Sequence, residues 1–122
     1  MIDNYHFKIE SSNKISLELK KYEKNIHSQF GQDGVLEFVL SKLGDLENIT
    51  ALEVGGWDGV HLSNICNLAK KYNSNCIFVE ANRKKYKQLL KNHESRISKN
   101  KVFAYNSLLT AKGDTSAGNF VK

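Results

Sequence analysis

The sequence contains no proline, only two cysteines and no long run of apolar residues. The cysteines form no CxxC pair and no two histidines stand at metal-ligand spacing, so we expect no metal site and two small buried thiols in a reducing compartment. No stretch approaches the ~20 apolar residues of a membrane span, and the first residues do not resemble a secretory signal. These absences favour a cytoplasmic protein with no membrane partner. The missing proline indicates no particular function.

The net charge of +5 comes almost entirely from lysine, because the chain has only two arginines. The densest basic run, residues 83–87, lies in a helical pattern in which Tyr86, Leu89 and Leu90 would face inward and the lysines outward. Nucleic-acid recognition relies heavily on the planar arginine side chain, which occurs once in this run. We therefore interpret the run as a solvated helix face and expect no nucleic-acid partner.

The pattern of apolar residues changes at about residue 45. Before it, apolar residues recur at helical spacing; after it, short apolar runs typical of buried strands alternate with amphipathic stretches typical of helices. The expected elements are helices from Ser11 to about Tyr22 and from Gly31 to Leu43, strands over 49–54, 76–79 and 101–105, and intervening helices from about Val60 to Tyr72 and from Asn82 to about His93.

Strand, helix, strand, helix, strand is the order of half a doubly wound sheet with right-handed crossovers. The sequence therefore predicts an α/β fold: a Rossmann-like three-layer sandwich with a truncated βαβαβ parallel sheet, preceded by two helices. We assign residues 1–44 to an N-terminal arm and helices and residues 45–122 to a Rossmann-like half-domain. Together they form one domain that we expect to be incomplete at its C-terminus.

A glycine-containing loop follows the first predicted strand, with Glu53 near the end of that strand. Gly55 and Gly59 would let the backbone approach a ligand that a Cβ atom would exclude, and a helix starting near Val60 would point free N–H groups into the same crevice. Ligands of open α/β sheets bind at the carboxyl ends of the strands. The loop therefore predicts a nucleotide-type site at this edge of the sheet.

The acids around the loop indicate which nucleotide it prefers. The loop reads Gly-Gly-Trp-Asp-Gly rather than G-x-G-x-x-G, and the carboxylates of Glu53 and Asp58 would repel a pyrophosphate. They would attract a ligand with an ammonium and a sulfonium, and S-adenosylmethionine carries both. Glu80 ends the second predicted strand, where an acid commonly accepts the ribose hydroxyls. The alternative is that both glutamates only cap strand ends and the glycines only form a tight turn.

Four motifs narrow the prediction further. They are Ser28-Gln29-Phe30-Gly31-Gln32-Asp33-Gly34, Glu53-Val54-Gly55-Gly56-Trp57-Asp58-Gly59, His61-Leu62-Ser63-Asn64 and Phe78-Val79-Glu80-Ala81-Asn82. Together they resemble the FkbM-like class I methyltransferases over about residues 26–106. The resemblance implies an enzyme that uses S-adenosylmethionine to methylate a hydroxyl group, with a sugar, glycan or other small molecule as substrate.

The resemblance also implies which residues bind the cofactor. The loop residues would line its methionine and ribose end, Glu80 would hold the ribose, and the two residues after Glu80 would lie beside the adenine. The glutamines and Asp33 of the first motif would brace the cofactor carboxylate or a lid, and Asn64 would tie a helix to the loop. The full set is Gln29, Gln32, Asp33, Glu53, Gly55, Gly56, Trp57, Asp58, Gly59, Asn64, Glu80, Ala81, Asn82, Asn106 and Ser107.

The chain departs from these relatives after the third predicted strand. Many relatives place an acid on the adenine amine where this chain has Asn106 and Ser107, and they continue through a fourth strand with an acidic motif. The departure suggests a fragment, a truncated product, or a domain completed by a C-terminal segment or a partner chain. It leaves open an alternative function, a non-catalytic cofactor-binding or assembly module. The third strand would form an exposed edge, so we expect a homo-oligomer or edge protection.

The catalytic residue stays unassigned. Methylation of a hydroxyl needs its proton removed, and a neutral histidine can do this near pH 7. His61 is the first candidate and His27 the second, although a histidine after a glycine loop is more often a surface or capping residue. Trp57 is expected to pack against the cofactor or to cover the loop.

Overall fold

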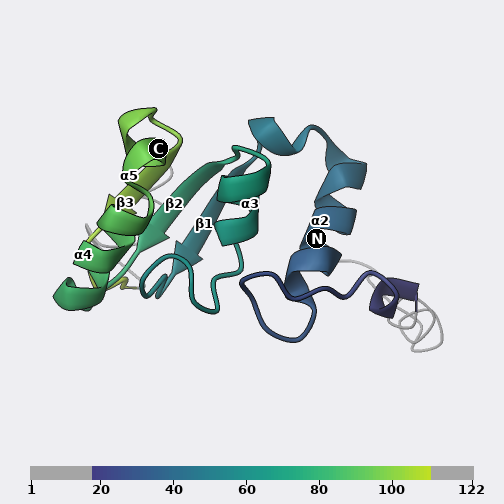
Figure 1. Ribbon diagram of the computed structural model, residues 1–122, viewed down its shortest axis with the longest axis horizontal. Helices are drawn as coiled ribbons and strands as arrows, with labels where there is room; N and C mark the ends of the chain where they lie inside the picture. Colours follow the sequence, from purple (N-terminus) through teal and green to yellow (C-terminus); the bar gives the residue numbers. More distant parts are fainter. Residues whose placement is uncertain (1–17, 111–122) are drawn as a thin grey trace, which may run out of the picture.

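The structure is a computed structural model that describes residues 18–110 (Figure 1). The expected start of the first helix and the polar tail at residues 113–119 lie outside the described residues. The described part centres on one parallel sheet with the strand order β1-β2-β3. Its strands are β1 (Thr50–Val54), β2 (Asn75–Val79) and β3 (Val102–Tyr105).

The register of the strands brings their carboxyl ends together. Val54 pairs with Val79, and Val79 pairs with Tyr105, so all three strands end at the same edge of the sheet. β2 lies in the centre and is the most buried strand, as its continuous apolar run predicts. The expected α/β, Rossmann-like fold is thus confirmed, and the edge that was expected to hold the ligand is formed by three adjacent strand ends.

The helices flank this sheet. α3 packs against β2, whereas α4 and α5 pack against β3 (Figure 1). α2 lies at the other end of the molecule and is linked to α3 through Glu37, whose carboxylate accepts hydrogen bonds from Lys71 Nζ at 2.9 Å and Asn67 Nδ2 at 3.2 Å. The helices are α2 (Gln32–Leu43), the short 3-10 helix η1 (Leu46–Asn48), α3 (Cys66–Lys71), α4 (Arg83–Asn92) and α5 (Glu94–Ser98).

The core lies between the sheet and these helices. Phe78 of β2 and Leu89 of α4 are fully buried there, together with side chains from α3 and β3. Both cysteines are free and buried, as expected of small apolar residues. Burial raises the pKa of the Cys66 thiol to about 11 and that of Cys76 to about 12, so neither is a reactive thiolate.

The helix expected from about Val60 is shorter than predicted, because α3 begins at Cys66. Ser63 Oγ accepts the backbone N–H groups of Ile65 at 3.3 Å and Cys66 at 3.0 Å, so Ser63 satisfies the first free N–H groups at the cap of α3, whose N-cap position is Ile65. Leu62 precedes this cap, has a positive φ of 60° and is 45% exposed, so it is not part of the helical stripe. The chain from Gly55 to Ile65 is therefore a long structured loop. In residues 18–110 no helix is both long and apolar enough to cross a membrane.

Candidate functional site

The glycine loop, residues 55–59, crosses the end of β2. The backbone N–H groups of Gly55 and Gly56 both donate to the carbonyl oxygen of Val79, at 2.8 Å and 3.2 Å. This pair of hydrogen bonds fixes the start of the loop above the carboxyl edge of the sheet. Glu53 and Glu80 flank it, one before the last residue of β1 and one directly after β2.

Glu53 joins the end of β1 to the segment that leads into α3. Its Oε2 accepts from Ser63 Oγ at 2.6 Å and its Oε1 accepts from the backbone N–H of Asn64 at 2.7 Å. Burial raises the pKa of Glu53 above its ordinary value, and nearby Asp33 acts in the same direction, while the two hydrogen bonds oppose the change. A nearby cation would relieve this cost, because an opposite charge favours the ionised carboxylate.

Glu53 also lines a pocket of about 410 Å³, which we call the loop pocket. It brings together the first strand end, the glycine loop and the segment before α3. Of the predicted cofactor-binding residues, only Glu53, Gly55, Gly56 and Trp57 line it, and Glu80 does not. The lining residues are Glu53, Gly55, Gly56, Trp57, His61, Leu62 and Ser63.

Glu80 braces the loop from the side of β2. It is only 6% exposed, its Oε2 accepts from the backbone N–H of Trp57 at 2.7 Å, and its Oε1 accepts from that of Asn82 at 2.7 Å. Each oxygen of an ionised carboxylate has a second acceptor position, so Glu80 keeps two acceptor positions beyond these bonds. Glu80 therefore organises the loop and Glu53 organises the segment before α3, and each keeps acceptor capacity.

The three glycines of the loop have different roles. Gly55 has a φ of +72°, and no atom lies within 4 Å of the position that its Cβ would occupy, so this point is open. At Gly59, with a φ of +75°, a Cβ would lie 2.9 Å from the His93 ring, and at Gly56 it would lie 2.8 Å from Phe78. The prediction that Gly59 makes room for a ligand is therefore corrected, because the room is filled by the protein's own core. Of the three loop glycines, only Gly55 has the open surroundings that a ligand needs.

Asp58 closes the loop rather than facing a ligand. Its Oδ1 accepts the backbone N–H groups of Val60 at 3.0 Å and His61 at 2.8 Å. Burial would raise the pKa of Asp58, but these hydrogen bonds and the charge of Lys85 hold it below its ordinary value. The N–H groups near Val60 that were expected to point into the crevice are thus already satisfied by this carboxylate.

Trp57 lies at the surface of the loop. Its backbone has a positive φ of 52°, its side chain is 43% exposed, and Lys85 Nζ lies 4.5 Å from the centroid of its ring. The ring lines the loop pocket, as does exposed His61. This placement is compatible with the expected covering role of Trp57.

Two residues at the end of α4, which the sequence analysis did not identify, hold the other end of the loop. Asn92 Nδ2 donates to the carbonyl oxygen of Asp58 at 2.8 Å, and His93 Nε2 lies 2.7 Å from the carbonyl oxygen of Gly59. His93 is fully buried. Its position four residues after Leu89, on the same face of a helix, is the signal that could have revealed its burial.

Asp33 organises the segment before α2. Its Oδ2 accepts three backbone N–H groups, those of Ile26 at 2.8 Å, His27 at 2.7 Å and Ser28 at 2.8 Å. Burial works in the opposite direction, but these bonds keep the pKa of Asp33 below its ordinary value. Its Oδ1 is buried without a hydrogen-bond partner. Asp33 therefore shapes this segment from inside and does not contact the loop pocket.

The neighbours of Asp33 face outward. Gln29 and Gln32 are exposed, and His27 is half-buried, with its pKa lowered first by burial and then by Lys70, against the effect of Asp33. Gln32 and Asn64 meet at a second, largely apolar cavity of about 550 Å³. Its lining residues are Phe30, Gln32, Val35, Leu36, Asn64 and Ile65.

The predicted adenine-side residues form a polar cluster around the ends of β2 and β3. Asn106 Nδ2 donates to the carbonyl oxygens of Glu80 at 2.8 Å and Ala81 at 3.1 Å, which ties the two strand ends together. Asn82 Oδ1 accepts the backbone N–H of Lys85 at 3.0 Å and caps α4. Ser107 Oγ is 3.5 Å from the carbonyl oxygen of Leu108, a weak local contact.

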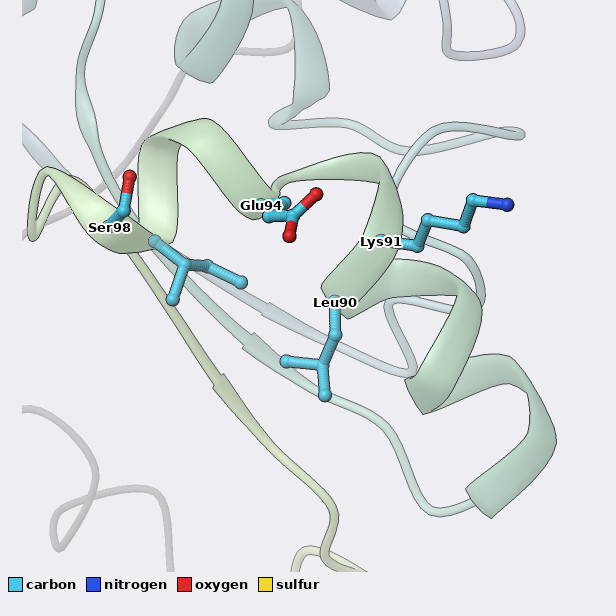
Figure 2. A pocket seen from close by; sticks show the side chains of 5 residues that line it. Leu90, Lys91, Glu94 and Ser98 are labelled. Atoms are coloured by element: carbon cyan, nitrogen blue, oxygen red, sulfur yellow. The ribbon is translucent and has the colours of Figure 1, made fainter.

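A further pocket of about 420 Å³ lies on α4 and α5, outside the predicted site (Figure 2). Figure 2 shows side chains of both helices around it, and no predicted cofactor residue lines it. Its lining residues are Leu90, Lys91, Glu94, Ile97 and Ser98. These residues supply controls that alter the same helices without touching the loop.

Comparisons with known proteins are sparse. No protein-family model matches the chain, and no curated protein matches it. Among solved structures, the chain is similar to a protein from Galdieria sulphuraria that has been assigned as a sarcosine dimethylglycine methyltransferase, with 14% sequence identity and a TM-score of 0.43. The match covers 80% of this chain and 42% of that chain, so the chain spans less than half the length of this structure. At this level of similarity only the site residues themselves can indicate a function.

Proposed function

We propose that the sheet edge at Glu53, Gly55 and Glu80 binds S-adenosylmethionine. We further propose that the chain supplies the cofactor-binding part of an FkbM-like O-methyltransferase acting on a hydroxyl of a sugar or other small molecule. The observation that carries the proposal is the open point at Gly55, which lines the loop pocket together with the carboxylate of Glu53. A ligand seated there would contact the carboxylate of Glu53, while Glu80 braces the same loop from the end of the adjacent strand.

The charges around the loop pocket fit a cationic ligand. Glu53 lines it with a carboxylate whose pKa is raised by burial, and a ligand ammonium would stabilise the ionised form. Among the described residues that line the pocket there is no lysine or arginine, which a phosphorylated ligand would need for compensation. Glu80 does not line this pocket, but its two spare acceptor positions would suit a ribose diol, which donates two hydrogen bonds.

When bound, the cofactor supplies an electrophilic methyl group for transfer to an oxygen atom. The contribution of the chain would be orientation, because holding two reactants in line removes a large part of the entropic barrier. Trp57 would cover the ligand from the solvent side, and His61, exposed at the same pocket, is the candidate that could accept the proton of the acceptor hydroxyl.

Isothermal titration calorimetry with S-adenosylhomocysteine tests the binding step directly. We expect saturable binding, and no comparable binding of ADP-ribose, which carries the same adenosine but a pyrophosphate in place of the amino-acid end. Circular dichroism on the same sample establishes that the protein is folded. Absence of heat with folded protein at millimolar ligand, or tighter binding of ADP-ribose, would overturn the proposal.

A further inference from the structure

The end of α4 holds two consecutive carbonyl groups of the glycine loop with two consecutive side chains. Asn92 donates to the carbonyl of Asp58 at 2.8 Å and His93 to that of Gly59 at 2.7 Å. A carbonyl oxygen can only accept, so Nε2 of His93 must carry the proton. We call these two side chains the loop clamp.

His93 is held in one protonation state by its surroundings. Its ring is fully buried, with its centroid 5.0 Å from that of Phe78, and Nδ1 has no hydrogen-bond partner. Burial lowers the pKa of His93, and the positive charges of Arg96 and Lys70 act in the same direction, against the bond to Gly59. Burial therefore favours the neutral ring, and the bond to Gly59 places its proton on Nε2.

The loop needs such support because its backbone is in a costly conformation. Gly55, Trp57 and Gly59 all have positive φ, and for Trp57 this region costs about 1–2 kcal/mol. The loop contains one short internal bond, from the N–H of Gly59 to the carbonyl of Gly56 at 2.7 Å. Conformations of this kind persist only where the surrounding structure holds them.

We propose that Asn92 and His93 are positioning residues that hold the glycine loop in the conformation in which Gly55 is open and the N–H of Trp57 reaches Glu80. This inference rests on the proposed function of the site and extends that function. The loop clamp would set the affinity for the adenosyl ligand without contacting the ligand. Glu80 and the clamp hold opposite ends of the loop, so loss of the clamp frees the end beyond Trp57.

Three variants separate positioning from a general loss of stability. His93→Leu keeps an apolar side chain of similar size but removes the donor, and Asn92→Ala removes the second donor at an exposed position. His93→Gln is the rescue variant, because its side-chain amide can donate to the same carbonyl. Leu90→Ala is the matched control, because Leu90 packs near the same end of α4 but faces the pocket of Figure 2.

Two readouts are measured on each protein: the amide hydrogen-exchange rate of Trp57 without ligand, and the Kd for S-adenosylhomocysteine. We expect His93→Leu to speed the exchange of Trp57 and to weaken binding by roughly tenfold each, as the loss of a buried hydrogen bond predicts. We expect Asn92→Ala to have smaller effects in the same direction, His93→Gln to restore both values, and Leu90→Ala to change neither.

The outcomes separate this proposal from the proposed function. A folded wild-type protein that does not bind S-adenosylhomocysteine overturns the proposed function, while the exchange rates still decide whether the clamp holds the loop. Exchange at the wild-type rate in both His93→Leu and Asn92→Ala overturns the clamp. Faster exchange with an unchanged Kd, in a protein that does bind, overturns its effect on affinity.

Discussion

Replacement of Glu80 by glutamine tests the central geometry of the site. The two carboxylate oxygens of Glu80 accept separate backbone N–H groups, those of Trp57 and Asn82, each at 2.7 Å. A glutamine side chain has only one oxygen, so its amide NH₂ group must face one of these donors. One hydrogen bond is lost and the other no longer has a charged acceptor.

The magnitude follows from these contacts. A hydrogen bond to a charged group contributes about 1.5–3 kcal/mol, and one between neutral groups about 0.5–1.5 kcal/mol. Because Glu80 is only 6% exposed, solvent compensates little, and we expect Glu80→Gln to lower the free energy of unfolding by about 2–4 kcal/mol. This is a large part of the roughly 5–15 kcal/mol that stabilises a typical domain.

Urea denaturation followed by circular dichroism measures this difference, with a midpoint shift of roughly 1–2 M urea at a typical m value. Glu94→Gln is the control, because Glu94 is exposed on α5 and the same chemical change there should alter stability by less than about 0.5 kcal/mol. If Glu80→Gln unfolds within about 0.5 kcal/mol of the wild type, the carboxylate does not brace the loop, and the reasoning is refuted.

Three further predictions follow from the same contacts. Gly59→Ala should lower the free energy of unfolding by about 2 kcal/mol or more, because its Cβ would meet the His93 ring at 2.9 Å, whereas Gly55→Ala should cost only about 1–2 kcal/mol of backbone strain and mainly weaken binding of S-adenosylhomocysteine. Urea unfolding and calorimetry distinguish the two, and equal effects on binding would contradict the assignment of Gly55. Because the pKa of Asp33 is lowered in the folded protein, its ionised carboxylate stabilises the fold above pH of about 3.8, and this stabilisation is lost as the pH falls through the folded-state pKa. Asp33→Asn should therefore flatten the dependence of the unfolding free energy on pH in the acid range. An unchanged slope in this variant would contradict the role of Asp33. For Glu53 the sign is reversed, because its pKa is raised in the folded protein: its contribution to stability is present below pH of about 4.5 and is lost as the pH rises through the folded-state pKa. Glu53→Gln should therefore remove this decline of the unfolding free energy with rising pH. A decline that persists in the variant would show that another group causes it.

Much of the fold follows from the sequence because its cause is local. Short apolar runs separated by amphipathic stretches indicated a parallel α/β sheet, since strands buried on both faces need continuous apolar residues. The acids Glu53 and Glu80 and the glycines between them were placed at the carboxyl edge by the same reasoning, because parallel strands all end there. In the structure Glu53 lines the loop pocket with Gly55 and Gly56, and Glu80 accepts the N–H of Trp57 in the same loop.

Other features were decided by side-chain contacts that the pattern of apolar residues does not reveal. The start of α3 moved to Cys66 because Ser63 Oγ accepts the N–H groups of Ile65 and Cys66, which a helix from Val60 would have bonded to its own carbonyl groups. The space beside Gly59 belongs to His93, 34 residues further along, which no periodicity could assign to this loop. The sequence by itself therefore determined the order of the elements and the residue types at the edge of the sheet. Only the tertiary structure decided which carboxylate lines the pocket and which glycine is open, because a side chain's partners depend on packing and not on its neighbours in the chain.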